Sequence, residues 1–166
     1  MRHSILPAIL LAFFCATFAS ADDIALNSPS GDIAVTIACG DALTYAVAVN
    51  GTQYIAPSPI SMTLMDGRIL GGTAKLLSQR EQIVKETILP AVREKRTEIP
   101  NVYNQTTLTF DGGYSVIFRA FDDGVAYRFA IALDGDIQVK SEQATFAFAG
   151  DYDAFKSYPK ELRTSF

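Results

Sequence analysis

The strongest constraint in this sequence is an alternation with a period of two, in which large apolar residues occupy every second position. The pattern is clearest in two segments, 32–38 and 42–49, where the large apolar residues are Ile33, Val35, Ile37, Leu43, Tyr45, Val47 and Val49. Successive side chains of a β-strand point to opposite faces of the sheet. The alternation therefore predicts half-buried strands in both segments.

Short alternating segments separated by turn residues continue along the chain. We predict further strands at 52–56, 60–65, 82–88, 104–110, 114–121, 125–132 and 144–149. The turns between them contain Asn50-Gly51, Asp111-Gly112-Gly113, Asp122-Asp123-Gly124 and Asp134-Gly135, with a positive φ expected at the glycines. We expect antiparallel neighbours whose inward residues include Val116, Phe118, Val125, Tyr127, Phe129 and Ile131. The fold class is all-β, an antiparallel β-sandwich.

Two stretches are less regular. The charged segment 92–96 lies between Pro90 and Pro100 and is predicted as a loop or an edge strand, because helical spacing is not sustained. Beyond residue 150 the sequence reads as a loop up to Phe166. A sheet that stops there would leave an edge or a face uncovered, so we expect a sandwich that is incomplete at its C-terminal end.

The N-terminus has the pattern of an export signal. A basic start at Arg2 precedes an apolar run over 5–18, and Ala19-Ser20-Ala21 offers a small-x-small cleavage site. This segment is too short for a transmembrane helix, and no second apolar run of membrane length follows. We predict a signal peptide over 1–21, one domain over 22–166, and a periplasmic or secreted protein.

Cysteine, histidine and charge exclude several functions. Within 22–166 the only cysteine is Cys39, interpreted as a small buried hydrophobic residue, and the only histidine, His3, lies in the signal. The domain therefore cannot form an internal disulfide, a nucleophile activated by histidine or a histidine-ligated zinc site. The net charge of −4, without a basic stripe, argues against a nucleic-acid partner.

The segment 118–129, Phe-Arg-Ala-Phe-Asp-Asp-Gly-Val-Ala-Tyr-Arg-Phe, resembles the signature strand pair in the N-terminal domain of glycoside hydrolase family 97, bacterial α-glucosidases and α-galactosidases. Weaker matches occur in the same order. These are the opening strand at 28–35, the strands at 43–51 and 57–65, and a Tyr-Asn-Glu motif at 103–105 in which Gln105 replaces glutamate. The resemblance covers about residues 28–155.

The resemblance implies a truncated β-supersandwich of the galactose-mutarotase type, followed in the longer enzymes by a catalytic (β/α)8 barrel. It implies no catalytic residue and no cofactor in this chain, with calcium in some full-length relatives. The N-terminal domain's glutamate ligand would fall at or just past Phe166, and Glu161 is out of step with it. The chain also departs from the family in having Val92-Arg93 where a Trp-Gly is usual.

Acidic residues suggest few sites. Asp122-Asp123-Gly124 and Asp134-Gly135-Asp136 could be acidic pairs for catalysis or metal binding, but hairpin turns explain them better. Asp151 and Asp153 would share a face of an extended segment and are weak candidates for a calcium site. A solvated loop is the simpler interpretation.

Arginines and tyrosines are the remaining candidates for sugar contact. Arg119 is a candidate substrate-binding residue, although Arg119 and Arg128 could instead lie on the solvent face or pair with Asp122 or Asp123. Among the tyrosines, Tyr152 and Tyr158 are the candidate surface platforms on which a pyranose ring could stack. For both groups a purely structural role is the alternative.

Two functions remain. The first is the non-catalytic N-terminal domain of a secreted glycoside hydrolase acting on α-linked sugars. Such a domain helps to shape the pocket for an oligo- or polysaccharide and packs on a barrel in the same polypeptide. We expect it to be inactive alone. The second is a free-standing secreted carbohydrate-binding or structural module without enzymatic activity.

Overall fold

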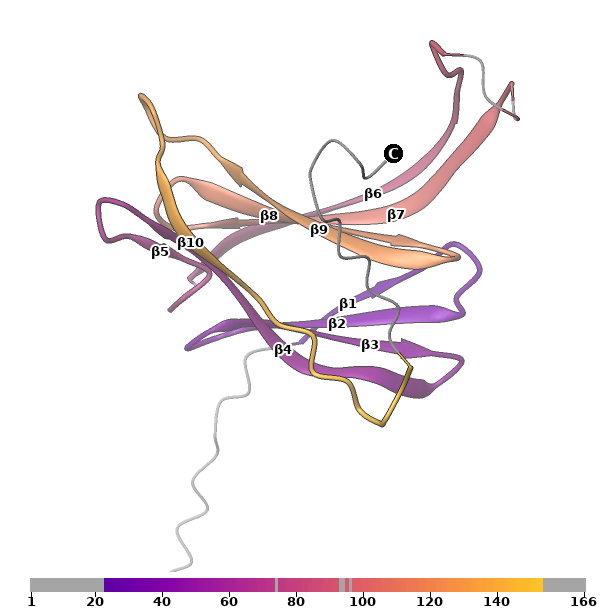
Figure 1. Ribbon diagram of the computed structural model, residues 1–166, viewed down its shortest axis with the longest axis horizontal. Coiled ribbons are helices and arrows are strands. Elements are labelled where there is room, and N and C mark those ends of the chain that lie inside the picture. The colour runs from indigo at the N-terminus through magenta and orange to yellow at the C-terminus, as the bar shows by residue number, and fades with distance from the viewer. Residues whose placement is uncertain (1–22, 74, 93–94, 96, 154–166) are drawn as a thin grey trace, which may run out of the picture.

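The computed structural model describes residues 23–73, 75–92, 95 and 97–153, and these form two antiparallel β-sheets packed face to face (Figure 1). The first sheet has the order β1-β2-β3-β4-β10, with the short β5 paired to β4. Its strands are β1 (Ile24–Asn27), β2 (Ile33–Cys39), β3 (Leu43–Val49), β4 (Thr52–Leu64), β5 (Ile69–Leu70) and β10 (Val139–Ala144).

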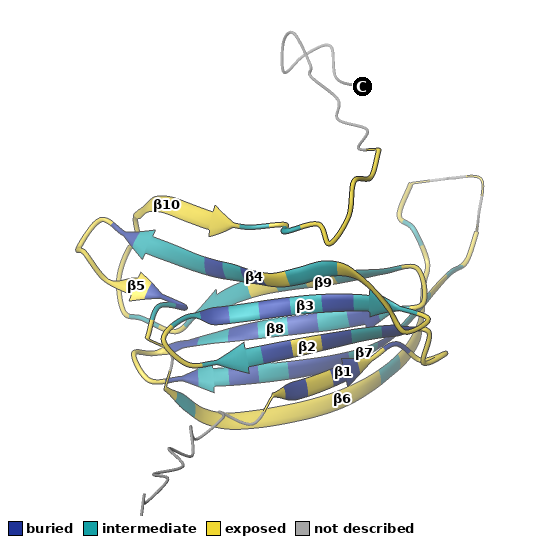
Figure 2. Cartoon of the chain, turned by 90° about the horizontal axis from the view of Figure 1, so that it is seen from below, coloured by how far each residue is buried: buried dark blue, intermediate teal, exposed yellow. Residues whose placement is uncertain are grey.

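The second sheet consists of four strands that follow one another in sequence, in the order β6-β7-β8-β9. They are β6 (Leu76–Ile88), β7 (Ile99–Phe110), β8 (Tyr114–Phe121) and β9 (Gly124–Ile131). The hairpin of β6 and β7 is the longest, and its end bends away from the first sheet (Figure 1). β6 is an edge strand and almost wholly exposed (Figure 2).

The core lies between the sheets and is built from the alternating residues. Along β2, β3 and β8 buried residues alternate with more exposed ones (Figure 2). Ile37 and Leu43 of the first sheet and Val116 and Phe118 of the second are fully buried. Burial of such side chains stabilises a fold by about 1.5–3 kcal/mol each. The sandwich therefore depends on the period-two pattern.

Most predicted strands are confirmed, some with different bounds. The predicted strands at 52–56 and 60–65 are one continuous strand, β4, which contains a bulge, and β6 begins at Leu76 rather than at 82. β1 was not predicted, although Ile24 and Leu26 alternate and are buried. The six inward residues of β8 and β9 are confirmed, those of β9 being half-buried against the core.

The predicted strand at 144–149 is wrong in its position. The regular strand is β10, which ends at Ala144, and only Phe148 forms an isolated bridge, with Ile55. The physical reason lies in β4, where Pro57 and Pro59 have no N–H to donate to a neighbouring strand. The amide of Ala147 donates instead to the Ser58 hydroxyl, at 2.9 Å.

One turn differs from the prediction. Gly51 and Gly135 have positive φ angles, as expected, but Gly124 does not. The hairpin of β8 and β9 therefore turns at Asp122 and Asp123 without a left-handed glycine. The Asp122 carboxylate accepts a hydrogen bond from the amide of Ser30 at 2.8 Å, and this bond lowers the pKa of Asp122. A structural turn is confirmed here.

Further hydrogen bonds join the two sheets. Gly71 has a φ of 79°, and its amide donates to the Tyr114 hydroxyl at 3.0 Å. A Cβ at this position would lie 2.7 Å from the Ile60 carbonyl oxygen, so only glycine fits without a shift of the backbone. Asn104 reaches across in the same way and donates to the Asn27 carbonyl at 2.8 Å.

No helix within the described residues is long and apolar enough to cross a membrane.

The buried hydroxyl of Thr106 generates a stability prediction. Its Oγ1 has no hydrogen-bond partner among the described residues, and the residue is 1% exposed. Thr106→Val removes a polar group whose burial is not compensated, so the free energy of unfolding should stay unchanged or rise by about 1 kcal/mol. Urea denaturation measures it.

Thr109→Val is the matched control, because Thr109 lies on the opposite face of β7 and its hydroxyl is 3.2 Å from that of Ser115. This variant should lose about 0.5–1 kcal/mol. An equal loss in Thr106→Val would show that its hydroxyl has a partner.

Tyr45 generates a prediction about alkaline pH. Its ring is buried and its hydroxyl donates to the Thr145 carbonyl at 3.0 Å. Burial, with a smaller contribution from Tyr127, raises the pKa of Tyr45 from 10.0 to about 12. The fold favours the protonated form, so this stabilisation is complete below pH 10 and is lost as the pH rises toward 12.

Tyr45→Phe should therefore reduce the fall of stability above pH 10, measured by thermal melts between pH 8 and pH 11. At pH 8 the variant should be less stable than the native chain, because it lacks the hydrogen bond to Thr145. An unchanged slope above pH 10 would contradict the assignment to Tyr45.

Candidate functional site

The outer face of the second sheet carries a block of polar side chains in cross-strand register. One row runs Gln82–Gln105–Arg119–Ala126 across β6, β7, β8 and β9. The next row runs Arg80–Thr107–Ile117–Arg128. The outward direction follows from the alternation, since the neighbours of these residues on β7 and β8 face the core.

Arg119 is held by two contacts within this face. Its Nε donates to Gln105 Oε1 at 2.9 Å, and its guanidinium carbon lies 4.5 Å from the centre of the Tyr103 ring. Gln105 is only 8% exposed and also donates to Gln82 Oε1 at 3.0 Å. The cation–π contact with Tyr103 and the hydrogen bond to the Gln105 side chain hold the Arg119 guanidinium in place in the absence of a ligand.

Arg128 lies beside this group. A depression of about 100 Å³ is lined by Ile117, Arg119, Ala126, Tyr127 and Arg128. Ala126 is the partner of Arg119 and Ile117 is the partner of Arg128, which makes the two arginines diagonal neighbours on adjacent strands. The structure thus brings together the two arginines that the sequence singled out. It does not pair either one with Asp122 or Asp123 among the described residues.

Tyr152 is exposed, as predicted, and belongs to a cluster of aromatic rings. It stacks on Tyr54 with ring centres 5.3 Å apart, and Phe148 meets it edge-on at 6.3 Å. These rings lie around β4 and the segment after β10, far in sequence from Arg119. Tyr158, the other predicted platform, lies outside the described residues.

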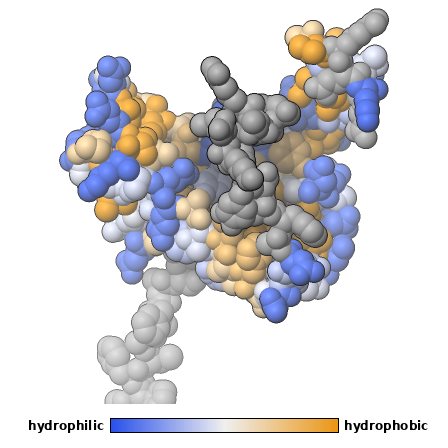
Figure 3. Space-filling view, viewed as in Figure 1, coloured by the Kyte–Doolittle hydropathy of each residue, from blue (hydrophilic) through white to orange (hydrophobic). Residues whose placement is uncertain are grey.

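An apolar cleft opens between the two sheets beside the aromatic cluster. It has a volume of about 250 Å³ and is lined by Tyr45, Val47, Ile55, Val125, Ala126, Tyr127 and Phe146. Figure 3 shows apolar residues at several places on the face in view, including its lower middle and its upper left. Phe146 and Phe148 are more than half exposed. The sandwich is therefore less closed on this side than at the β2–β8 centre.

The acidic candidates do not converge on a site. Asp151 and Asp153 are exposed, and no group of three metal-binding side chains occurs in the described part of the chain. A calcium site at these two residues stays a prediction.

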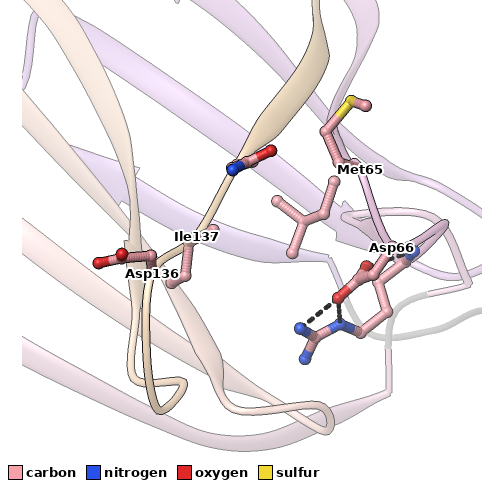
Figure 4. Close-up of a pocket in the computed structure, with 7 residues that line it drawn as sticks. Met65, Asp66, Asp136 and Ile137 are labelled. Atoms are coloured by element: carbon pink, nitrogen blue, oxygen red, sulfur yellow. Dashed lines mark hydrogen bonds and ion pairs between the residues drawn. The ribbon is translucent and has the colours of Figure 1, made fainter.

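Asp66 and Asp136 line a hollow of about 210 Å³ but lie apart (Figure 4). Asp66 pairs with Arg68, whose Nε donates to it at 2.7 Å, and this bond lowers the pKa of Asp66. Asp136 points away from that pair (Figure 4).

The sequence did not identify Gln82, Gln105 and Tyr103 as partners of Arg119. In the sequence, Gln105 stands out only because it replaces the glutamate of a Tyr-Asn-Glu motif. The alternation places Tyr103 and Gln105 on the same face of β7, but the register to β8 that brings them to Arg119 is visible only in the structure. Cys39 is half-buried rather than fully buried, and burial raises the pKa of its thiol.

Comparison with known sequences gives one family match and related enzymes. The family described as Glycosyl-hydrolase 97 N-terminal matches residues 26–165. A retaining alpha-galactosidase of Bacteroides thetaiotaomicron is 38% identical over 156 residues, which are 93% of this chain and 23% of that protein. A probable retaining alpha-galactosidase of Streptomyces bingchenggensis is 30% identical over 118 residues, 69% of this chain and 18% of that protein.

Solved structures share the fold. A family 97 glycoside hydrolase of a Pseudoalteromonas strain, in complex with panose, has a TM-score of 0.66 at 24% identity. It covers 76% of this chain, which corresponds to 20% of that chain. A beta-arabinopyranosidase has a TM-score of 0.68 at 24% identity over 76% of this chain and 21% of its own. This chain spans about a quarter or less of each relative.

Proposed function

The chain belongs to the Glycosyl-hydrolase 97 N-terminal family, and on that premise we propose that it is the non-catalytic N-terminal β-sandwich domain of a secreted glycoside hydrolase that acts on α-linked sugars. The observation that carries this proposal is the match to the N-terminal family over nearly the whole chain, together with the small share of the relatives that it covers.

The proposed role of the domain is to pack on a catalytic (β/α)8 barrel and to help shape its substrate pocket. Hydrolysis of a glycosidic bond usually uses two carboxylates on opposite sides of the bond. The family resemblance assigns these groups to the barrel. Calcium belongs to this proposal only as a possible ion of the longer enzyme, and export depends on the predicted signal at 1–21.

Arg119 and Tyr152 are the proposed sugar contacts among the described residues. Arg119 is preorganised by Gln105 and Tyr103 and offers donors to hydroxyl oxygens. Tyr152 is 44% exposed and presents part of an aromatic ring to solvent. The two side chains lie on different parts of the molecule, so each is tested separately.

The alternative is a free-standing secreted carbohydrate-binding or structural module. The observation that favours it is the continuous core shared by both sheets, which contains Phe110 and Phe118 of the second sheet and Ile37 and Leu43 of the first. A domain with its own core can fold alone. A cooperative thermal melt of the isolated chain supports this alternative, and aggregation without its continuation supports the first proposal.

The first proposal predicts no turnover of nitrophenyl α-galactoside or nitrophenyl α-glucoside by the purified chain. The physical reason is the absence of a barrel to supply the acid and the nucleophile. A longer polypeptide that includes the barrel should turn over at least one of them and should lose most of that activity when residues 22–153 are deleted. Turnover by the chain alone would refute the proposal.

Sugar contact at Tyr152 predicts weaker retention on an immobilised α-galactoside or α-glucoside gel. Tyr152→Ala removes the ring and should reduce retention severalfold, because stacking on an aromatic face depends on ring area. Ile69→Ala is a control, since Ile69 is also exposed but lies in β5, outside the aromatic cluster. Equal retention of the native chain and Tyr152→Ala would exclude this contact.

A further inference from the structure

We propose that Arg119 and Arg128 form a binding site for a carboxylate group, carried by an acidic sugar. The carboxylate part of the proposal rests on the geometry of the outer face of the second sheet. Only the choice of a sugar as its carrier rests on the proposed function.

The first argument is the neutral partner of Arg119. A buried or half-buried arginine usually faces a carboxylate, which compensates its charge. Here the acceptor at 2.9 Å is the amide oxygen of Gln105, and Gln105 is more than nine-tenths buried. The guanidinium is therefore held by a neutral acceptor, and among the described residues no carboxylate forms an ion pair with it.

The second argument is the composition of the face. Three registered rows cross β6 to β9, beginning at Gln82, Arg80 and Ser78. They contain Arg80, Arg119 and Arg128 but neither aspartate nor glutamate. The nearest outward carboxylate on β6, Glu86, is hydrogen-bonded to Asn101. The chain as a whole has a net charge of −4, so this face is cationic on an acidic protein.

The third argument is the space that the arginines enclose. The depression of about 100 Å³ between Arg119 and Arg128 is large enough for a carboxylate group. Within the described residues only the Nε of Arg119 has a hydrogen-bond partner, and its two terminal nitrogens can form the paired hydrogen bonds that carboxylates accept. Ile117 and Ala126 give the depression an apolar floor, which strengthens these bonds.

Titration with sodium glucuronate, sodium acetate and glucose tests the proposal, on the purified chain or, if that chain aggregates, on a longer polypeptide that includes the barrel. The readout is the NMR signal of the Arg119 Nε–H, together with the backbone amides of β8 and β9. Glucuronate should bind with a dissociation constant in the millimolar range and shift these signals, and the affinity should fall with added salt. Glucose, which has hydroxyl groups but no carboxylate, should bind more weakly and shift them less.

Gln105→Glu is the decisive variant. It preserves the length of the side chain and the acceptor for Arg119 Nε, but it adds a negative charge beside the guanidinium. Affinity for glucuronate should fall about tenfold, because Arg119 is then paired internally. Gln143→Glu is the matched control, since it changes the net charge equally on β10 of the other sheet. It should leave the affinity unchanged.

Each outcome decides one part. No shift at Arg119 with glucuronate, or equal weakening by Gln105→Glu and Gln143→Glu, overturns the carboxylate site. Acetate binding as tightly as glucuronate supports the carboxylate site and rejects the sugar as its carrier. Retention of neutral α-galactosides without binding of glucuronate would leave the proposed function standing and reject this inference alone. Melting curves of each variant confirm that the fold is intact.

Discussion

The structure depends on the burial of one face of each sheet against the other. Ile37, Leu43, Val116 and Phe118 fill the space between the sheets, and every second residue of β2, β3 and β8 is committed to it. The alternate residues of these strands therefore face outward. The outward position of Arg119 and Arg128 on the second sheet is thus a direct consequence of the alternation that the core imposes.

The sequence predicts the sandwich well because its information is local. An alternating segment and an Asp/Gly turn identify a hairpin without knowledge of the rest, and β8 was predicted with its observed bounds. The predictions that fail are those in which the structure of a segment depends on the strand or loop beside it. Proline residues in β4 interrupt its pairing with the segment after Ala144, and the two-residue turn at Asp122 needs no left-handed glycine. β1 is too short to show more than two alternating apolar residues.

The candidate site was predictable only in part. Alternation places Arg119 and Arg128 on the outer face, but the partner of Arg119 depends on which residue of β7 lies opposite it. The sequence suggests either the solvent face or a turn carboxylate for Arg119, whereas the register places Gln105 beside it. One amide in place of a carboxylate changes the charge of the whole row. Whether this face holds an internal ion pair or an unpaired arginine therefore depends on residue 105, where glutamine replaces the glutamate of the motif.

The hydrogen bonds between the sheets have a mechanical consequence. β8 is tied to the first sheet at both ends, by Gly71 to Tyr114 near its start and by Ser30 to Asp122 just beyond its last residue. On the neighbouring strand β7, Asn104, which lies opposite Ala120 of β8, donates to the Asn27 carbonyl of the first sheet. A sliding displacement of one sheet along the other would have to break these three hydrogen bonds in addition to disturbing the packed core. These hydrogen bonds fix the position of the second sheet relative to the first, and with it the position of the side chains on the outer face of the second sheet.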